Sequence, residues 1–188
     1  APTISAIDAP GAVDEDAANI ILEIIPYDED TGAELTVSIE TNNGDIFPES
    51  SITLEPAATV SSGDTVMVTL NPADNANGSA LVTVNVTDQY GSGAAPQQFT
   101  AVVNEINDAP VATNAAIDPA LPELEDDLGL NYIYYDIDGD NETGTVITWF
   151  KDDSMQTVYN NLLTIPASAT ACDEVWYATV VPSDGDTT

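Results

Sequence analysis

The sequence predicts an all-β protein made of two tandem β-sandwich domains, residues 1–107 and 108–188. Short runs rich in β-branched residues alternate with turn residues, and signals for helices are nearly absent. The opening pair Ala1-Pro2 recurs as Ala109-Pro110, about a hundred residues later. A repeat of this length, with a polar junction that ends in proline, is typical of tandem domains.

Seven strands are expected in the first block, which is the number in many β-sandwiches. Strict alternation is clearest where Leu35, Val37 and Ile39 point inward, and an Asn43-Gly44 turn follows. In the longest run Ala80, Val82, Val84 and Val86 point inward, so Asn85 points to solvent. The expected strands are 3–7, 19–25, 35–40, 51–54, 65–70, 80–87 and 98–104.

The second block is expected to contain strands at 128–135, 145–151, 162–165 and 174–181, and it lacks a closing strand comparable to 98–104. We interpret Trp149 as core and leave Trp176 either core or a sugar-stacking platform. Three explanations of the absent strand remain open. In the first, the sequence is truncated before the strand; in the second, the strand is disordered or lies beyond a processed end; in the third, another copy donates it, as in donor-strand complementation.

The charge of the chain excludes several classes of function. There are 33 acidic residues against one basic residue, Lys151, and the formal net charge is −32. Nucleic acids and anionic membrane surfaces are excluded as partners, because both require Lys and Arg, and no apolar run suggests membrane insertion. Self-repulsion of this size must be relieved by bound cations or by high salt.

Catalysis is not expected. The chain has no His, so His-based triads are impossible, and carboxylates this abundant carry no positional information. The single Cys172 cannot form an internal disulfide, and we expect it to be a small buried hydrophobe.

Acidic residues gather at the ends of predicted strands, where oxygens from several loops could ligate Ca²⁺. The segment 136–142 places alternate acidic residues around Gly139, which permits a tight, oxygen-rich turn. Solvated acidic loops are the simpler alternative for any single cluster. The metal candidates in these clusters are Asp28, Asp30, Asp88, Asp136, Asp138, Asp140, Glu142 and Asp184.

The segments 87–92 and 103–110, Thr-Asp-Gln-Tyr-Gly-Ser and Val-Asn-Glu-Ile-Asn-Asp-Ala-Pro, resemble the end of a cadherin-like or immunoglobulin-like tandem repeat of microbial surface proteins. Segments 136–140, 148–151 and 181–185 are similar to immunoglobulin-like modules of such proteins. The resemblance implies an extracellular adhesin stalk or fibre with calcium bound between domains. The ligands that it implies are Glu15, Asn107, Asp108, Asp136 and Asp138. The chain has no clear Asp-Arg-Glu motif before Asp88, a departure from the cadherin pattern.

We therefore expect a structural building block of an extracellular fibre, adhesin stalk or cell-surface assembly, stiffened by calcium. Its partners would be other copies of itself or adjacent repeats, and the alternative is a carbohydrate-binding or adhesive module that recognises surface glycans. The glycosylation sequons begin at Asn77, Asn85 and Asn141. The segment expected to donate a strand consists of Thr3, Ile4, Ser5, Ala6 and Ile7.

Overall fold

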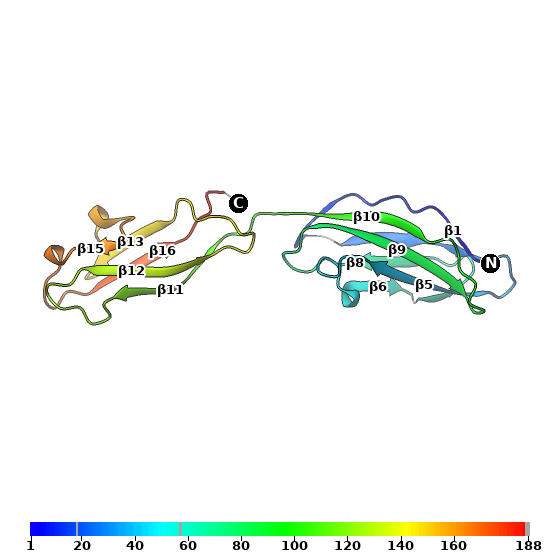
Figure 1. The fold of residues 1–188 in the computed structure, drawn as a ribbon, viewed down its shortest axis with the longest axis horizontal. Helices are drawn as coiled ribbons and strands as arrows, with labels where there is room; N and C mark the ends of the chain where they lie inside the picture. The colour runs from blue at the N-terminus through cyan, green and yellow to red at the C-terminus, as the bar shows by residue number, and fades with distance from the viewer. Residues whose placement is uncertain (18, 57, 187–188) are drawn as a thin grey trace. The chain divides into compact units, whose positions relative to one another are not determined.

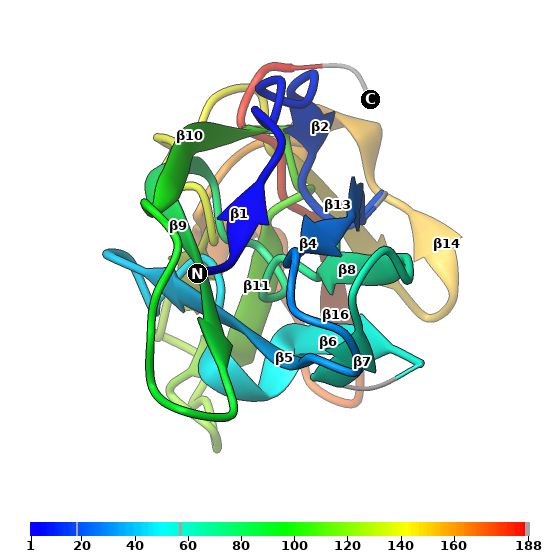
Figure 2. The same ribbon diagram turned by 90° about the vertical axis from the view of Figure 1, so that its right-hand side faces the viewer.

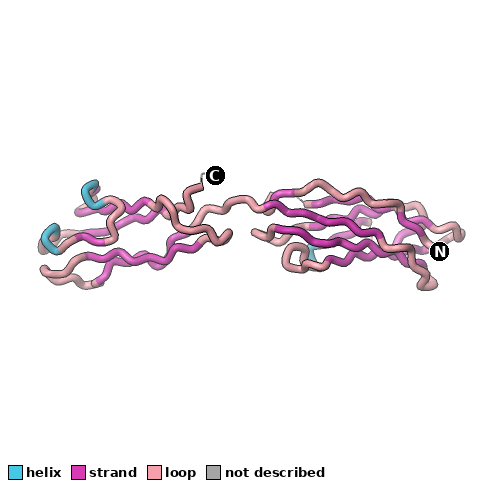
Figure 3. The backbone as a smooth tube through the Cα atoms, turned by 45° about the horizontal axis from the view of Figure 1, so that its top comes forward, coloured by secondary structure: helices cyan, strands magenta, loops and turns pink. Residues whose placement is uncertain are grey.

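A computed structural model describes residues 1–17, 19–56 and 58–186, and it divides into two compact units, 1–106 and 107–188. Strands and loops make up nearly all of the chain, which confirms the all-β expectation (Figure 3). Among the described residues the helices are single 3-10 turns, and none is long and apolar enough to cross a membrane.

Unit 1 is a sandwich of two sheets whose strands pair antiparallel except at one edge (Figure 1). Its strands are β1 (Thr3–Ile4), β2 (Val13–Asp14), β3 (Ile20–Ile24), β4 (Pro26–Tyr27), β5 (Glu34–Thr41), β6 (Ile52–Glu55), β7 (Thr59–Ser61), β8 (Val66–Leu70), β9 (Gly78–Asp88) and β10 (Gln97–Asn104), with a 3-10 turn at Glu49–Ser51.

The strand order of unit 1 is that of an immunoglobulin-like fold. One sheet has the order β2-β10-β9-β5-β7 and the other β3-β8-β6. The first two strands lie apart: β1 pairs with β4 in a separate two-stranded sheet, whereas β2 runs parallel to the last strand, β10 (Figure 2). Consecutive strands that alternate between two sheets in this way form the Greek key of such sandwiches.

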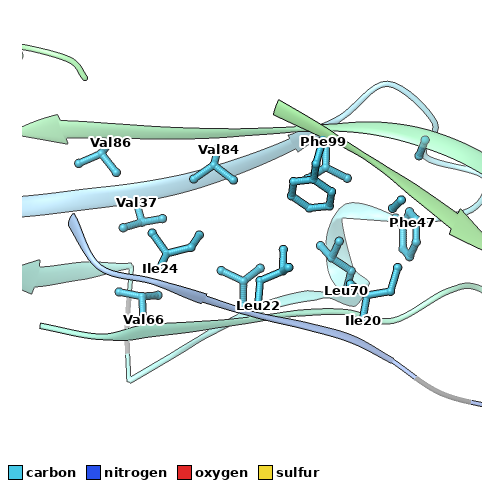
Figure 4. Close-up of a cluster of buried hydrophobic side chains, with 14 of the residues drawn as sticks. Ile20, Leu22, Ile24, Val37, Phe47, Val66, Leu70, Val84, Val86 and Phe99 are labelled. Atoms are coloured by element: carbon cyan, nitrogen blue, oxygen red, sulfur yellow. The ribbon is translucent and has the colours of Figure 1, made fainter. Parts of the chain in front are cut away.

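The core of unit 1 lies between these two sheets, where the alternation of each strand places its apolar side chains. Ile20, Leu22 and Ile24 of β3 face Val84 of β9 and Phe99 of β10 across the interior (Figure 4). These side chains are at most 8% exposed. The inward positions expected from alternation in β9 are confirmed, and Ile39 alone among those expected in β5 is only half-buried.

Unit 2 is a smaller sandwich with a three-stranded sheet on each side of its core, ordered β11-β12-β15 and β14-β13-β16. Its core centres on Trp149, which is fully buried and donates its indole N–H to the carbonyl of Leu162 at 2.8 Å. The elements are β11 (Val111–Asp118), β12 (Leu128–Tyr135), β13 (Val146–Lys151), β14 (Ser154–Met155), β15 (Thr164–Ile165) and β16 (Trp176–Val181), with 3-10 turns at Thr157–Tyr159 and Ala167–Ala169.

Several sequence expectations require correction. The first strand ends at Ile4 rather than Ile7. Strand β11 was not expected, because its side chains are mostly exposed and show no alternation, and a bulge interrupts its pairing with β12. Strands β2, β7 and β14 were also not expected, since each is two or three residues long. Cys172 is exposed, so it is not a core residue.

Candidate metal centre

The loop that follows β12 brings three carboxylates together. Asp136, Asp138 and Asp140 each place an oxygen within 4.8 Å of the other two. The Oδ1 atom of Asp136 accepts hydrogen bonds from the N–H groups of Asp138 (2.9 Å) and Asp140 (3.2 Å), and Gly139 at φ +83° allows the tight turn. Asp136 therefore shapes the loop with one oxygen and leaves its second oxygen for another role.

That second oxygen is unusual. Asp136 is only 8% exposed, and no hydrogen bond reaches its Oδ2 atom within the described part of the chain. Because a buried carboxylate oxygen without a partner costs free energy, a further ligand is expected at this position. The carbonyl Oδ1 of Asn107 is also buried without a partner among the described residues.

The segment before β11 is tied to the same loop. Asp108 donates its backbone N–H to Oδ2 of Asp138 at 2.7 Å, and the Asn107 amide donates to Oδ2 of Asp184 at 3.1 Å. The bond from Asn107, followed by one from the N–H of Asp186, lowers the pKa of Asp184. Residues from three distant parts of the sequence therefore meet at one end of unit 2.

The charges at this end repel one another. Burial raises the pKa of Asp140, and the neighbouring carboxylates of Asp136, Asp138 and Asp184 raise it further. Burial also raises the pKa of Tyr134, followed by the charges of Asp136 and Asp184. Such shifts report a concentration of negative charge that a cation would relieve.

The donors fit Ca²⁺. Carboxylate oxygens, amide carbonyl oxygens and water are its usual ligands, and it takes six to eight oxygens. Asp136, Asp138, Asp140 and Asn107 are the residues that would hold it. Glu142 is engaged elsewhere: its Oε1 accepts from the Tyr132 hydroxyl at 2.6 Å, which raises the pKa of Tyr132 to about 12.

Four other expected ligands belong to unit 1. Glu15 is 2% exposed, and its Oε1 accepts the N–H of Ile106 at 2.9 Å, while no hydrogen bond reaches Oε2 among the described residues. Asp28 is buried at the end of β4, Asp30 is exposed two residues later, and Asp88 ends β9. The three carboxylates of the 136–140 loop are the one group of this closeness among the described residues.

Sequence reasoning missed the tyrosines of this site. Tyr132 and Tyr134 lie four and two residues before Asp136 on the same face of β12 and its extension. The period of two that places alternate strand residues on one face could have identified them.

The remaining candidate residues are placed as follows. Asn77 and Asn141 are exposed, whereas Asn85 is half-buried on the outer face of β9, opposite Ser38 of β5, and is not fully in solvent as expected. Ile4 and Ile7 pack partly against the core of unit 1, and Thr3, Ser5 and Ala6 are exposed.

Trp176 is half-buried and already has partners. Its indole N–H donates to Glu174 at 3.0 Å, the ammonium of Lys151 lies 5.8 Å from its ring centroid, and Tyr159 meets it edge-on. Lys151 also forms an ion pair with Glu174 at 3.0 Å.

No protein-family model matches the chain, and no curated protein matches it in sequence. Solved structures align with it at low identity. Tandem Ig repeats of Dlar align at 14% identity over 98% of this chain and 91% of that one, with a TM-score of 0.37. The SrpA adhesin R347E mutant from Streptococcus sanguinis aligns at 10% identity over 73% and 93%, with a TM-score of 0.39. The D00-D0 domain of Intimin aligns at 11% identity over 98% and 87%, with a TM-score of 0.34.

Proposed function

We propose that this chain is a structural or adhesive module of an extracellular or cell-surface assembly and that its second unit binds calcium. The observation that carries the calcium proposal is Oδ2 of Asp136, a buried carboxylate oxygen without a hydrogen-bond partner in a loop that also presents Asp138 and Asp140. The acidity of the chain and its immunoglobulin-like architecture support an extracellular module, and two of the aligned structures are named as an adhesin and Intimin.

The proposed role of the ion is mechanical. Ca²⁺ would neutralise the carboxylates that now raise the pKa of Asp140 and would add bonds to Asn107, which already contacts Asp184. Residues 107 and 108 lead directly into β11, so their conformation would become fixed by the loop at 136–140. Calcium is therefore proposed to stiffen the entry of the chain into unit 2.

Calorimetric titration with Ca²⁺ tests the binding proposal. We expect at least one saturable site in the whole chain, and we expect Asp136→Asn to weaken this site at least tenfold, because the substitution removes a buried ligand and its charge. Glu125→Gln removes one charge from an exposed position of the same unit and should leave binding unchanged. Equal weakening by both variants would show that only general acidity attracts the ion.

The stiffening is tested separately by ¹⁵N relaxation of the amides of residues 104–110. We expect saturating Ca²⁺ to raise their order parameters and a chelator to lower them. If binding occurs while these order parameters stay constant, unit 2 binds calcium without the mechanical role.

Assembly through strand donation is a further part of the proposal. Within the described residues β16 pairs along one side only, with β13. Its inward-facing Trp176, Ala178 and Val180 remain half-exposed. An additional strand beside β16 would cover them, and we propose that another copy supplies it through residues 3–7, where only Thr3 and Ile4 pair with a neighbouring strand.

Light scattering over a range of protein concentrations, followed by negative-stain electron microscopy, tests strand donation. We expect chains of copies that shorten when Ile4→Asp is introduced, since a buried charge in the added strand is costly. Thr3→Asp, at an exposed position of the same segment, is the matched control. A strict monomer at all concentrations would refute donation between copies and leave the calcium proposal untouched.

A further inference from the structure

One side of unit 1 is open between its two sheets. Strand β7 pairs only with Glu34–Thr36 of β5, so residues 38–41 of β5 pair with β9 alone among the described strands. Strand β6, at the edge of the other sheet, runs along the same side (Figures 1 and 2). The inward-facing Ile39 of β5 and Ile52 of β6 are therefore only half-buried where they meet the core.

A groove of about 340 Å³ lies between these two strands, within the range of about 300–1,000 Å³ that is usual for ligand pockets. Its apolar lining consists of Ile39, Ile52 and the fully buried Phe47. The exposed Glu40 and Glu49 also line it, and neither forms an ion pair within the described part of the chain. The groove therefore combines an apolar surface with negative charge that the described residues do not neutralise.

The open side also presents unpaired backbone groups. The N–H of Val37 donates to the carbonyl of Ala58 at 2.8 Å, on the side of β7, whereas the N–H of Asn42 donates to β9. Because alternate residues of a strand direct their N–H and C=O groups to opposite edges, Ile39 and Thr41 direct theirs to the open side. In the described part of the chain no backbone hydrogen bond reaches either residue on that side. Such an edge is a template for an added strand.

The charge of the groove decides which kind of strand it accepts. A second copy of this chain is a poor match, because each copy carries a net charge of −32. Its single basic residue, Lys151, ends β13 and is already ion-paired with Glu174. Glu40 lies on the outer face of β5, where a cross-strand neighbour of like charge destabilises the pairing and one of opposite charge stabilises it. The matching strand therefore carries Lys or Arg and comes from another protein.

We propose that this groove binds an extended, basic segment of another protein, which adds a strand to the open edge of β5. Alternate apolar side chains of the segment enter the groove against Ile39, Phe47 and Ile52, and the Lys or Arg between them lies beside Glu40. Unit 1 is then a docking module for a cationic partner. This inference does not depend on the metal centre of unit 2, with which the groove shares no residue.

Titration of the ¹⁵N-labelled whole chain with the capped peptide Thr-Ile-Lys-Ile-Lys-Val-Thr, followed by ¹H–¹⁵N NMR, tests the proposal. We expect the amides of residues 38–41 and 44–52 to shift in a saturable manner. Hydrogen exchange of the Ile39 and Thr41 amides should slow at least tenfold in the complex, because both gain bonds to the peptide. Exchange of the Glu40 amide, which already points toward β9, should stay nearly unchanged.

Matched controls isolate the charge of the groove. Glu40→Gln should weaken peptide binding at least fivefold at low salt, because it removes the charge beside the peptide lysine. Glu34→Gln removes the same charge from an exposed position of the same strand, beside β7, and should leave binding unchanged. The peptide with Glu in place of both Lys should not bind.

Each of the other outcomes overturns the inference. Equal binding of the lysine and glutamate peptides, or equal weakening by Glu40→Gln and Glu34→Gln, would show that the groove does not recognise a basic residue. Shifts without slower exchange of Ile39 and Thr41 would show that no strand is added. Shifts confined to residues 176–181 would place the added strand beside β16 and not in this groove. No shift up to about 1 mM peptide would refute docking of a basic segment.

Discussion

Strands β9 and β16 hold equivalent places in the two units but differ in how well they are covered. β9 pairs with β5 on one side and β10 on the other, and its Val82, Val84 and Val86 are at most 1% exposed. β16 pairs with β13 alone among the described residues, and its inward-facing side chains stay half-exposed. The comparison shows that alternation along a strand decides which way a side chain points, whereas pairing with neighbouring strands on both sides decides whether it is shielded from water.

The two cores differ accordingly. Among the described residues, nineteen buried hydrophobic side chains form the core of unit 1 and five form that of unit 2. Because hydrophobic stabilisation scales with the apolar area removed from water, unit 2 is expected to be the less stable unit.

The largest expected effect comes from removing the centre of the smaller core. Trp149→Ala should destabilise unit 2 by about 3–5 kcal/mol, since it leaves a large cavity and breaks the bond to Leu162. We expect unit 2 to unfold while unit 1 retains its structure, as measured by dispersed NMR amide signals from each unit. Phe47→Ala, an equally buried aromatic in unit 1, should cost a similar amount without unfolding its unit. Unfolding of both units by Trp149→Ala would contradict their independence.

Calcium should stabilise unit 2 by about 2.7 kcal/mol at a concentration of one hundred times the dissociation constant.

The effect of Asp140→Asn on the melting temperature of unit 2 should have opposite signs in chelator and in saturating Ca²⁺. In chelator it should raise the melting temperature, because the charge removed is one that its neighbours repel. In saturating Ca²⁺ it should lower the melting temperature, because a ligand is lost. A shift of the same sign in both conditions would argue against a metal ion at this loop.

A pair of matched substitutions measures the difference in coverage directly. Val86→Thr should destabilise unit 1 by about 1–3 kcal/mol, because it buries a hydroxyl without a partner. Val180→Thr makes the same change on half-exposed β16 and should cost less than about 0.5 kcal/mol. Denaturant unfolding of each variant supplies the two values. Equal costs would mean that the inner face of β16 is covered in solution.

The smallest expected effect concerns Glu174. Hydrogen bonds from the Trp176 indole and from Lys151 lower its pKa in the folded state. The resulting stability is present above the pKa of the unfolded state and is lost as the pH falls through the lower, folded pKa. Lys151→Gln should therefore reduce the melting temperature of unit 2 by less than about 2 °C at neutral pH, with no difference below the folded pKa. Thermal unfolding of the variant and the unchanged chain at several pH values measures this difference in melting temperature. A difference that stays constant as the pH falls would contradict the prediction.

The sequence predicted those parts of the fold that alternation controls. The strands around Val37, Val84 and Ile147 bury every second side chain, so their positions were visible in the pattern of residues. Strand β11 could not be predicted from the pattern of residues, because it is held by backbone pairing with β12 and buries little of its own surface. Two-residue strands such as β2 exist only because a distant partner, β10, lies beside them.

The same division applies to the candidate metal centre. The spacing of Asp136, Asp138 and Asp140 around Gly139 identified the loop, since the turn is a local feature. The contact of Asn107 with Asp184 spans most of unit 2 and follows from the closure of the sandwich, so no local pattern specifies the pairing. Asp136 is buried because it continues the inward face of β12, and this burial is what distinguishes it from the other acidic residues.

Lys151 determines where proteases that cleave after basic residues can cut the chain. It is the single basic residue, so enzymes that cleave after Lys or Arg have one target bond in 188 residues. That residue is the last of β13, paired with Trp176 of β16 and held by Glu174. Proteolysis favours exposed loop tips over paired strands. The bond after Lys151 leads into such a tip, the exposed turn at Asp152 and Asp153 between β13 and β14, so trypsin-like enzymes are expected to cut the chain at this one place, within unit 2.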